Sequence, residues 1–570
     1  MSEHTSSSFR DKDDTAKSPG ALETGVQDAN EKHLDIIHGH DDGDGAQITL
    51  ASLLLGVGIC VGGFLFGYDI GVISGCLVMP DFINRFGAPD PKNPGLNYLP
   101  DEHSSLITSL LSAGTFFGAL LQAPVSDYAG RKASMLVWAG FFTVGAIVQT
   151  ASGDKSQSAN LAQIVAGRFI AGLGVGALSG LCPLYLAETA PKSIRGAMVS
   201  CYQLLIIFGI FLSYAISYGT HHIETSSASW RVPVGLQCAW GLGLVAIMIF
   251  LPESPRWLLQ RERPVEARRI MANMRGITLQ SQQHNPIPSS SSSSKKGIND
   301  NDGALRGDAA MEADLQEMVE GIEAEAAAFA GRNYITAYAL CFGRKGQMWR
   351  RTLTGMMLQT LQQLCGQNFY YYYGPTFFKA AGTQLDPLLI QLIFGAVSLA
   401  CTVPALITIE NVGRRKSLLV GAAAQAFCAY VVAFVGHYGL APDKQAPQNA
   451  SQRNSANAFI AFAVLHLAAF SALWGPTPWV YLSESFPQHL RAKSISLGSA
   501  ANWFWNFMLS YFSNKIAAKY GPFIMLIFGS VMIFAVLFVF FAVPEVKGLT
   551  LEQVDEMYDD RSWASATSSS

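Results

Sequence analysis

Long apolar stretches separated by short polar ones run along most of this chain of 570 residues. A stretch of about 20 apolar residues is long enough to cross the hydrocarbon core of a bilayer as a helix. The pattern therefore predicts a protein that crosses a membrane many times. We expect twelve spans, at residues 49–74, 104–124, 132–151, 160–185, 196–218, 232–251, 350–374, 387–409, 416–439, 456–480, 494–517 and 521–543.

The polar segments divide these spans into two groups of six. Between the sixth and seventh spans lies a segment with a charged helical pattern (256–275), a serine run (289–294) and an acidic helical pattern (311–330). The serine run needs no packed core and is expected to be flexible. The chain is thus predicted to consist of a disordered tail, a six-helix bundle, a helical linker, a second six-helix bundle and a short tail, over residues 1–48, 49–251, 252–349, 350–543 and 544–570.

The composition agrees with a lipid environment. Hydrophobic residues make up 50% of the chain and charged residues 14%, whereas soluble proteins carry about 25% charged residues. The lipid bilayer is therefore an expected partner. The formal net charge is only −3, and no basic patch indicates binding to nucleic acid.

Lysine and arginine counts predict the orientation of the spans. One set of alternate loops holds 19 of these residues and the opposite set holds 9. Because cytoplasmic loops are enriched in positive charge, the first set and both termini are expected in the cytoplasm. The sequon at Asn449 falls in a loop assigned to the outside, and we expect a glycan there.

Nine cysteines lie mostly within or beside apolar spans, and none forms a Cys-x-x-Cys pair. This pattern predicts small buried hydrophobic residues and no metal site. The polar, acidic N-terminus contains no cleavable signal peptide, so the first span is expected to serve as its own insertion signal.

The seventh span is unusually polar, with side-chain amides at Gln359, Gln362, Gln363, Gln367 and Asn368 and four tyrosines after them. Amides at this depth are costly unless they face a partner or a water-filled cavity. One explanation is that they join helices to one another. Because five lie within ten residues, we favour a site for a ligand rich in hydroxyls, such as a sugar.

That site requires the seventh span to bend. On an ideal helix Gln363 and Asn368 lie about 140° apart around the axis, so they share one cavity only if the helix is interrupted. Gly366 and the pair Gly374-Pro375 are the residues expected to permit this.

Three pairs of motifs recur in the same order in the two halves. The segment 127–132 matches 410–415 at an offset of 283 residues, and 188–195 matches 484–491 at an offset of 296. The segment beginning Pro-Glu at 252 matches that at 544, at an offset of 292. The repeat predicts two halves of the same orientation with a binding site between them, as in secondary transporters.

These motifs, with Gly67-Tyr68-Asp69, Gly167-Arg168 and the run 362–368, resemble the sugar porters of the major facilitator superfamily over residues 50–556. Within that family the chain is most similar to fungal hexose transporters. The resemblance implies an all-α membrane protein, with twelve transmembrane helices in two parallel six-helix repeats and a cytoplasmic helical linker. Tyr128 departs from the family, which often has arginine there.

The resemblance also implies a cytoplasmic latch that clamps the two halves together while the cavity faces outward. The alternative for these charges is ordinary enrichment of positive residues on the cytoplasmic side. The predicted latch residues are Asp127, Arg131, Glu188, Arg195, Glu253, Arg256, Glu410, Arg414, Glu484 and Arg491.

Asp69 is the only charged residue between Thr49 and Pro80, and a carboxylate in a span is usually functional. Its expected partner is Arg168. Resemblance to proton-coupled members implies that this pair couples proton movement to transport, which makes the proton a co-substrate. The alternative is a permanent structural ion pair, since facilitators in the family can carry the same aspartate.

The resemblance assigns sugar contacts position by position. Amides are expected to bind hydroxyls, two tyrosines to form an aromatic gate, and an indole to cover the C–H face of the sugar. Ser398 stands where many members have asparagine, which is expected to affect affinity or specificity. The predicted contacts are Gln203, Gln362, Gln363, Asn368, Tyr372, Tyr373, Trp479, Asn502 and Asn506.

The sequence therefore predicts a plasma-membrane hexose transporter, with glucose as the first candidate, that works as a monomer by alternating access. Proton symport is preferred to facilitated diffusion. A sugar sensor on the same scaffold is the other alternative, but only 25 residues follow Glu545, whereas sensors usually carry long tails. The chain has no Gly-Lys dipeptide and hence no ATP-binding loop of the Walker type. No enzymatic activity and no cofactor are expected.

Overall fold

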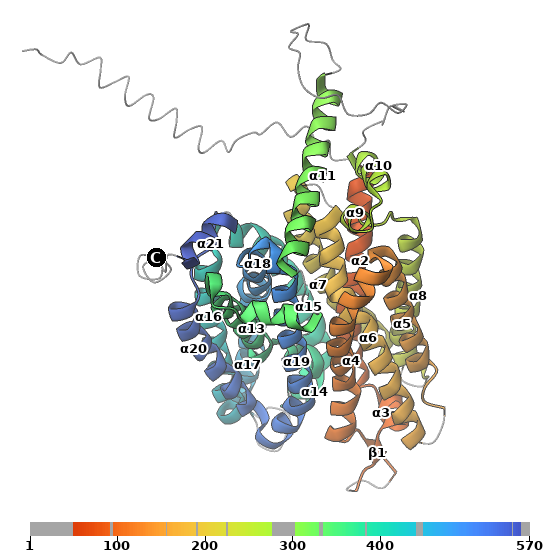
Figure 1. The fold of residues 1–570 in the computed structure, drawn as a ribbon. Helices are drawn as coiled ribbons and strands as arrows, with labels where there is room; N and C mark the ends of the chain where they lie inside the picture. Colours follow the sequence, from red (N-terminus) through yellow and green to blue (C-terminus); the bar gives the residue numbers. More distant parts are fainter. Residues whose placement is uncertain are drawn as a thin grey trace, which may run out of the picture.

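The computed structural model describes residues 50–559 except 92–94, 155–156, 190–191, 224–225, 276–301, 330–333, 382, 384, 441–448 and 550. The expected N-terminal tail and the serine run at 289–294 lie outside the described residues. Two bundles of helices stand side by side, with the linker helices at one end (Figure 1). We call that end the linker face, and the opposite end, which carries a short hairpin, the hairpin face.

The first bundle contains six spans. A short helix and a two-stranded antiparallel hairpin follow the first span and cover the hairpin face. These elements are α2 (Leu50–Cys76), α3 (Pro80–Phe86), β1 (Ala88–Pro89), β2 (Asn97–Tyr98), α4 (Asp101–Ala129), α5 (Arg131–Thr150), α6 (Gln157–Thr189), α7 (Lys192–Thr220) and α8 (Ala228–Phe250).

The second bundle also contains six spans, two of which are interrupted. Its elements are α13 (Met348–Leu364), α14 (Gln367–Ala380), α15 (Pro387–Val412), α16 (Arg414–Phe434), η3 (Val435–Gly439), α17 (Ala450–Ala469), η5 (Phe470–Trp474), α18 (Thr477–Glu484), α19 (Gln488–Tyr520), η6 (Gly521–Phe523) and α20 (Ile524–Ala542).

Apolar composition supports the twelve predicted spans. In the described part of the chain, ten helical stretches are long and apolar enough to cross a membrane. One of them, Lys493–Ala542, has 50 residues and contains both α19 and α20. The seventh span is not among the ten, because its two pieces have only 17 and 14 residues.

Small residues bring the spans of the first bundle into close contact. A Cβ atom added to Gly114 or Gly118 of α4 would lie 2.3 or 2.2 Å from a backbone oxygen of α6. On α6, Gly172 and Gly176 approach backbone oxygens of α4 equally closely. Such contacts between small residues are typical of helix packing in membranes, where dispersion forces replace the hydrophobic effect.

The linker contains four α-helices, two more than predicted. The charged pattern 256–275 forms two helices, because a turn with Glu262 at φ 58° precedes Pro264, which begins the second. Leu258, Met271 and Leu315 form the apolar contact between these helices and the acidic helix. The linker elements are α9 (Pro255–Gln260), α10 (Pro264–Arg275), α11 (Asp302–Phe329), α12 (Tyr334–Ala339), η1 (Leu340–Phe342) and η2 (Lys345–Gln347).

A further helix, α21 (Leu551–Asp559), packs on the linker face of the second bundle. Tyr558 is 1% exposed, and its hydroxyl lies 3.1 Å from that of Tyr481. The guanidinium of Arg351 lies 4.3 Å from the ring of Tyr558. Burial raises the pKa of Tyr558 above its usual range. The predicted short tail thus begins as a docked helix.

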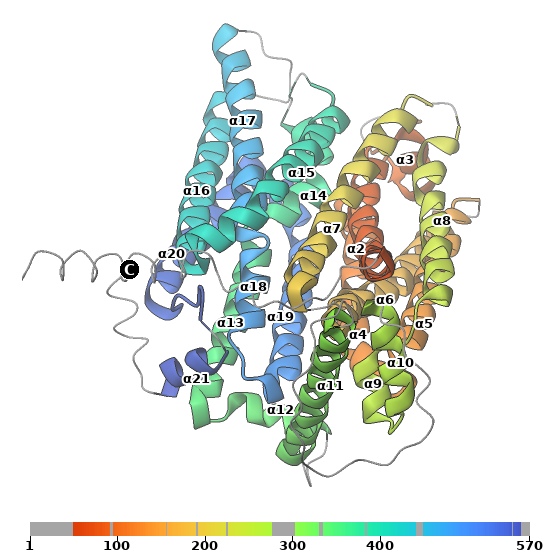
Figure 2. The same cartoon turned by 90° about the horizontal axis from the view of Figure 1, so that it is seen from above.

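The two bundles meet at the hairpin face. Asn514 of α19 donates to Asp101 of α4 at 3.4 Å, and Gln391 of α15 donates to Ser74 of α2 at 3.3 Å. At Gly395 of α15, an added Cβ would lie 3.0 Å from the Cα of Phe211 in α7. Figure 2 shows the two groups of helices, with α14 and α15 of the second beside α7 of the first.

Candidate functional site

The interruption of the seventh span occurs at Gly366, which has φ 95°. Residues with a side chain rarely adopt this left-handed conformation. An added Cβ would also lie 2.7 Å from the ring of Phe528. Both the backbone conformation and the close contact with Phe528 therefore require glycine at position 366. The sequence thus determines the break between α13 and α14.

The predicted second breaker, Gly374-Pro375, is wrong: both residues lie inside the continuous helix α14. Proline lacks the N–H that would bond the carbonyl of Tyr371, four residues earlier. That carbonyl instead accepts from the amide of Gln391 at 3.1 Å and the hydroxyl of Tyr214 at 3.3 Å. Because neighbouring helices satisfy it, the helix continues.

Gln363 lies at the centre of a buried amide network. Its Nε2 donates to Asn502 at 2.8 Å, and its Oε1 accepts from Asn368 and, at 2.8 Å, from Asn506. The bond to Asn368 spans the break in the helix, so the two amides that an ideal helix would separate face the same space. Among the described residues, four predicted sugar contacts are thereby brought together.

Asn502 joins this network to the tenth span. Its Nδ2 donates to Gln359 at 2.7 Å and to Gln362 at 2.9 Å. Gln362 in turn donates to the carbonyl of Gly475 at 2.5 Å. Gly475 follows the π-helical turn η5, where the tenth span is interrupted. The two interrupted helices are therefore connected by side-chain amides, each of which offers both donors and an acceptor.

Two predicted gate residues close this network toward the hairpin face. Tyr372 and Tyr373 are each 1% exposed. Tyr372 donates to Asn506 at 3.1 Å, and Tyr373 donates to the carbonyl of Ser510 at 2.6 Å. Ser112 of the first bundle also donates to Asn506, at 2.6 Å. The site is therefore sealed on this side by contacts between the bundles.

Trp503 covers the network on its other side and was not predicted from the sequence. Its indole N–H donates to Ser179 of α6 at 3.3 Å, and its ring meets Phe66 of α2 edge-on at 5.2 Å. Both partners belong to the first bundle. Trp503 stands between two predicted contacts, Asn502 and Asn506, and its position in the span is the signal that could have identified it.

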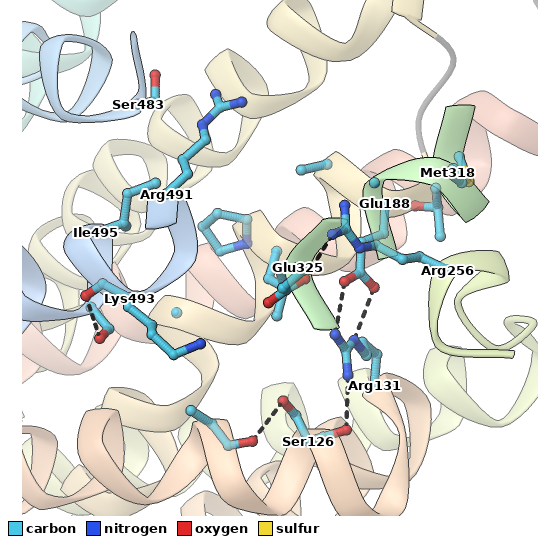
Figure 3. Close-up of a pocket in the computed structure, with 18 of the residues that line it drawn as sticks. Ser126, Arg131, Glu188, Arg256, Met318, Glu325, Ser483, Arg491, Lys493 and Ile495 are labelled. Atoms are coloured by element: carbon cyan, nitrogen blue, oxygen red, sulfur yellow. Dashed lines mark hydrogen bonds and ion pairs between the residues drawn. The ribbon is translucent and has the colours of Figure 1, made fainter. Parts of the chain in front are cut away.

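A cavity of about 950 Å³ opens between the bundles at the linker face. Gln122 and Ser179 of the first bundle and Ser499 of the second are among the residues that line it. In Figure 3, Arg131 and Glu188 lie on one side, and Arg491 and Lys493 on the other. The cavity reaches Ser179, whose hydroxyl accepts from the indole of Trp503. The protein is thus open at the linker face and closed at the hairpin face.

The predicted partners Asp69 and Arg168 form an ion pair at 2.9 Å, and both side chains are 0% exposed. Arg168 also donates to the carbonyl of Ile107 at 3.1 Å. The sequence did not indicate the third member: Gln237 of α8 donates to the same oxygen of Asp69 at 2.9 Å. A neutral amide 168 residues away carries no signal of its own, because single glutamines in spans usually join helices.

The ion pairs at the linker face lie within the bundles. In the first bundle Arg131 binds Glu188 through two contacts at 2.8 and 2.9 Å and Asp127 at 3.3 Å. In the second bundle Arg414 binds Glu484 through two contacts at 2.8 and 3.0 Å. The internal repeat thus has an exact structural counterpart, one bidentate pair in each half.

The third repeated motif holds the start of a helix in each half. Glu253 accepts from the backbone N–H of Arg131 at 2.8 Å, and Glu545 accepts from that of Arg414 at 2.9 Å. Carboxylates at helix N-termini satisfy otherwise unpaired N–H groups and interact favourably with the helix dipole. Glu253 therefore positions the backbone of Arg131, and Glu545 positions that of Arg414.

The remaining latch residues take different positions. Arg256 of α9 pairs with Glu325 of α11 at 3.1 Å, so this pair joins two linker helices to each other. Glu410 and Arg491 line the cavity on the side of the second bundle. Arg195 lies in α7, and its side chain is outside the described part of the structure.

Three other predicted site residues lie apart from the amide network in the described part of the structure. Gln203 is half-buried in α7. Trp479 packs against the apolar cluster that contains Leu482 and Phe486, one turn beyond Gly475. Asn449 is exposed immediately before α17, at the hairpin face. Ser398 is buried, with its hydroxyl 3.4 Å from that of Tyr371.

No group of three or more histidine, cysteine, aspartate or glutamate residues in the described ranges could hold a metal ion. All nine cysteines have free thiols, and six of them are buried, among them Cys60 and Cys182. The chemistry available at the site is therefore hydrogen bonding by amides and hydroxyls, together with one buried ion pair.

Comparison with known proteins gives a consistent result. The family model described as "Sugar (and other) transporter" matches residues 55–304 and 293–558. The low-affinity glucose transporter HXT3 of Saccharomyces cerevisiae is 36% identical over 550 residues, which cover 96% of this chain and 89% of the relative. A galactose transporter of the same yeast is 34% identical and covers 89% of this chain and 81% of the relative.

Solved structures of the xylose transporter XylE from E. coli have the same fold. Its partially occluded inward-open conformation is 25% identical, with a TM-score of 0.67, and covers 88% of this chain and all of that one. XylE bound to 6-bromo-6-deoxy-D-glucose, described as a proton:xylose symporter, is 26% identical with a TM-score of 0.68; the match covers 89% of this chain and 99% of that one.

Proposed function

The chain belongs to the sugar transporter family, and on this premise we propose that it carries a hexose, glucose first, across the plasma membrane by alternating access. The observation that carries the proposal is the amide network around Gln363 and Asn502. It borders the first bundle at Ser112 and is closed by Tyr372 and Tyr373 on one side. On α19, Trp503 next to Asn502 bonds to Ser179, which lines the cavity. Amides in this position can exchange their mutual bonds for bonds to sugar hydroxyls.

The linker face is assigned to the cytoplasm, with both termini on that side. The excess of lysine and arginine at this face supports the assignment. The exposed position of Asn449 at the opposite end is compatible with a glycan. On this assignment the structure corresponds to a protein open to the cytoplasm.

In the opposite conformation, the linker face closes and the predicted latch residues act together. Arg131–Glu188 and Arg414–Glu484 lie on facing sides of the cavity, so closing it brings two networks of charge toward each other. Arg256 and its partner Glu325 lie on linker helices that border the same cavity. Arg195, Glu410 and Arg491 complete the set that the repeat assigns to this role.

We assign the sugar-binding role to the predicted set, with Trp479 and Gln203 joining the amides once the bundles rearrange around the ligand. Trp479 follows the interruption at Gly475, whose carbonyl already binds Gln362. A movement of α18 about this interruption would carry the indole toward the network.

Proton symport is the finer part of the proposal, and Asp69 is the residue that would take up the proton. Its carboxylate is fully buried beside Arg168 and Gln237, and one of its oxygens has no partner in the described structure. A buried carboxylate whose partners change during the cycle changes its proton affinity. In a facilitator, the Asp69–Arg168 ion pair would stay the same in every conformation and no proton would be carried. The experiment must therefore decide whether a proton gradient drives transport.

The test is uptake of labelled hexoses by a host that lacks hexose transporters, with and without a protonophore. Hexose uptake that accumulates sugar and collapses with the protonophore supports symport. Uptake that only equilibrates sugar, indifferent to the protonophore, identifies a uniporter. Gln362→Ala and Trp479→Ala are expected to depress uptake at unchanged surface level. Sugar-dependent signalling with no uptake would instead favour a sensor.

A further inference from the structure

One ion pair in the described structure joins the two bundles at the hairpin face. His221 follows the end of α7 in the first bundle, and Asp386 immediately precedes α15 in the second. The Nε2 of His221 lies 3.2 Å from Oδ2 of Asp386, and the two side chains are 19% and 36% exposed. The pair therefore sits at the solvent end of the seam that closes this face. We call it the hairpin-face clasp.

The hydrogen-bond partners of His221 define its protonation state. Its Nδ1 lies 2.6 Å from the backbone carbonyl of Tyr218, which can only accept, so Nδ1 must carry a proton. Its Nε2 faces a carboxylate oxygen, which also accepts. A neutral imidazole has a single N–H and can satisfy one of these partners. Both contacts are satisfied together only when the ring is the imidazolium cation.

Asp386 is held in place independently of the histidine. Its Oδ1 accepts from the backbone N–H of Leu388 at 2.9 Å, which caps the N-terminus of α15. The other oxygen remains available to His221. The carboxylate is thus presented at a fixed position by the second bundle, whereas its partner belongs to the first. The contact therefore joins the two bundles across the closed hairpin face.

We propose that the hairpin-face clasp is a proton-binding site that stabilises the conformation open to the cytoplasm. Because His221 gains its second partner only in that conformation, the closed face binds the proton more tightly than the open face. By linkage, acid outside then favours the closed face. Histidine is the side chain whose ordinary titration falls between about pH 5 and 8. The inference rests on the alternating-access cycle of the proposed function.

The titratable groups nearest to His221 lie on its own segment and on α15. The ring of His222 lies 3.9 Å from that of His221, and Tyr218 lies 5.3 Å from it on the same segment. From α15 the facing group is Asp386. Glu224 lies outside the described residues and is neutralised in the test as Glu224→Gln, in every variant.

The experiment measures closure of the hairpin face directly. Spin labels carried by unnatural amino acids at Glu102 of α4 and Lys519 of α19 report the distance between the bundles in lipid nanodiscs, without using the nine native cysteines. The ratio of closed to open distances is recorded at pH 7.5 and pH 5.5. For a partly exposed ion pair, we expect this ratio to rise about two- to five-fold in acid.

Three substitutions separate the clasp from other titrating groups. Asp386→Asn keeps the helix cap and removes the charge, and His221→Gln removes the titration; both are expected to abolish the acid-induced rise. His221→Lys is expected to keep the face closed at both pH values. The control is His437→Gln, whose ring stacks on Phe523 at 3.8 Å on the same face; it is expected to retain the full rise.

An unchanged rise in His221→Gln, or no rise in the unmodified pair, would overturn the proposal. Hexose flux is measured in parallel with the same proteins in liposomes. Absence of flux with a normal acid-induced closure would contradict the proposed function alone. Normal flux with no effect of pH on closure would contradict the clasp alone.

Discussion

The substitution Gln363→Leu tests whether the amide network is the sugar site. Leucine has a similar size but no hydrogen-bonding group. It removes the bonds to Asn502 and Asn506, both 2.8 Å, and the bond to Asn368 across the helix break. Gln363 is 7% exposed and its partners Asn502 and Asn506 are 2% exposed, so the abandoned groups are shielded from bulk water.

The magnitude follows from the number of groups left without this partner. An unpaired buried polar group costs about 1–3 kcal/mol, so three give an upper range of about 3–9 kcal/mol. Asn368 is only half-buried, so water can replace part of the lost bonding. This places the expected loss of unfolding free energy near the lower end, about 3 kcal/mol. Hexose affinity should fall at least about tenfold, since one lost bond of about 1.4 kcal/mol suffices.

Unfolding free energy is measured by denaturant titration in micelles, and affinity by binding of labelled glucose to the purified protein. Asn514→Leu is the matched control, because this amide lies on the same helix α19 but bonds only to Asp101, at 3.4 Å, near the surface. Stability and affinity both close to those of the control would refute the reasoning. A loss of stability with unchanged affinity would show that the amides only join helices.

Three further predictions follow from the geometry of single residues. Asp69→Asn should abolish accumulation of sugar yet preserve sugar-for-sugar exchange, because exchange needs no net proton movement. If exchange is lost as well, Asp69 has a structural role, since the change leaves the charge of Arg168 uncompensated and can damage the fold. Gly366→Ala should lower the melting temperature through both its φ of 95° and its 2.7 Å approach to Phe528. In a Phe528→Ala background, compared with Phe528→Ala alone, the same change should still lower the melting temperature, but by less; no further loss in that background would mean that backbone strain contributes nothing. Asn449→Gln should remove a glycan. Treatment with an N-glycosidase should then lower the mass of the unmodified protein but not that of the variant. An unmodified protein whose mass does not change would contradict the assigned orientation.

Much of this fold could be predicted because the bilayer imposes simple rules on sequence. Apolar length gave the spans, and the repeated charged motifs gave two halves of one orientation. The break at Gly366 was predicted because two amides on opposite sides of an ideal helix had to share one cavity. Gly374-Pro375 failed as a breaker because Gln391 and Tyr214 bond the carbonyl that proline leaves free. That compensation comes from helices distant in the chain, so no local pattern reveals it.

The parts of the site that the sequence did not reveal depend on contacts between bundles. Gln237 becomes significant only because α8 places it 2.9 Å from Asp69. Trp503 becomes an inner cover only because Phe66 and Ser179 of the other bundle lie against it. Aromatic and neutral polar residues are common in spans, and their roles are decided by which neighbours the packing supplies. Charged residues are rare there, which is why Asp69 and Arg168 could be paired from sequence.

The central claim is that this chain alone moves a hexose across a membrane. The most direct test is the purified protein in liposomes preloaded with unlabelled glucose, to which labelled glucose is added outside. Counterflow should give a transient accumulation of label, saturable in glucose and reduced in Gln363→Leu. Saturable binding with no flux, in protein shown to be folded, would contradict the account.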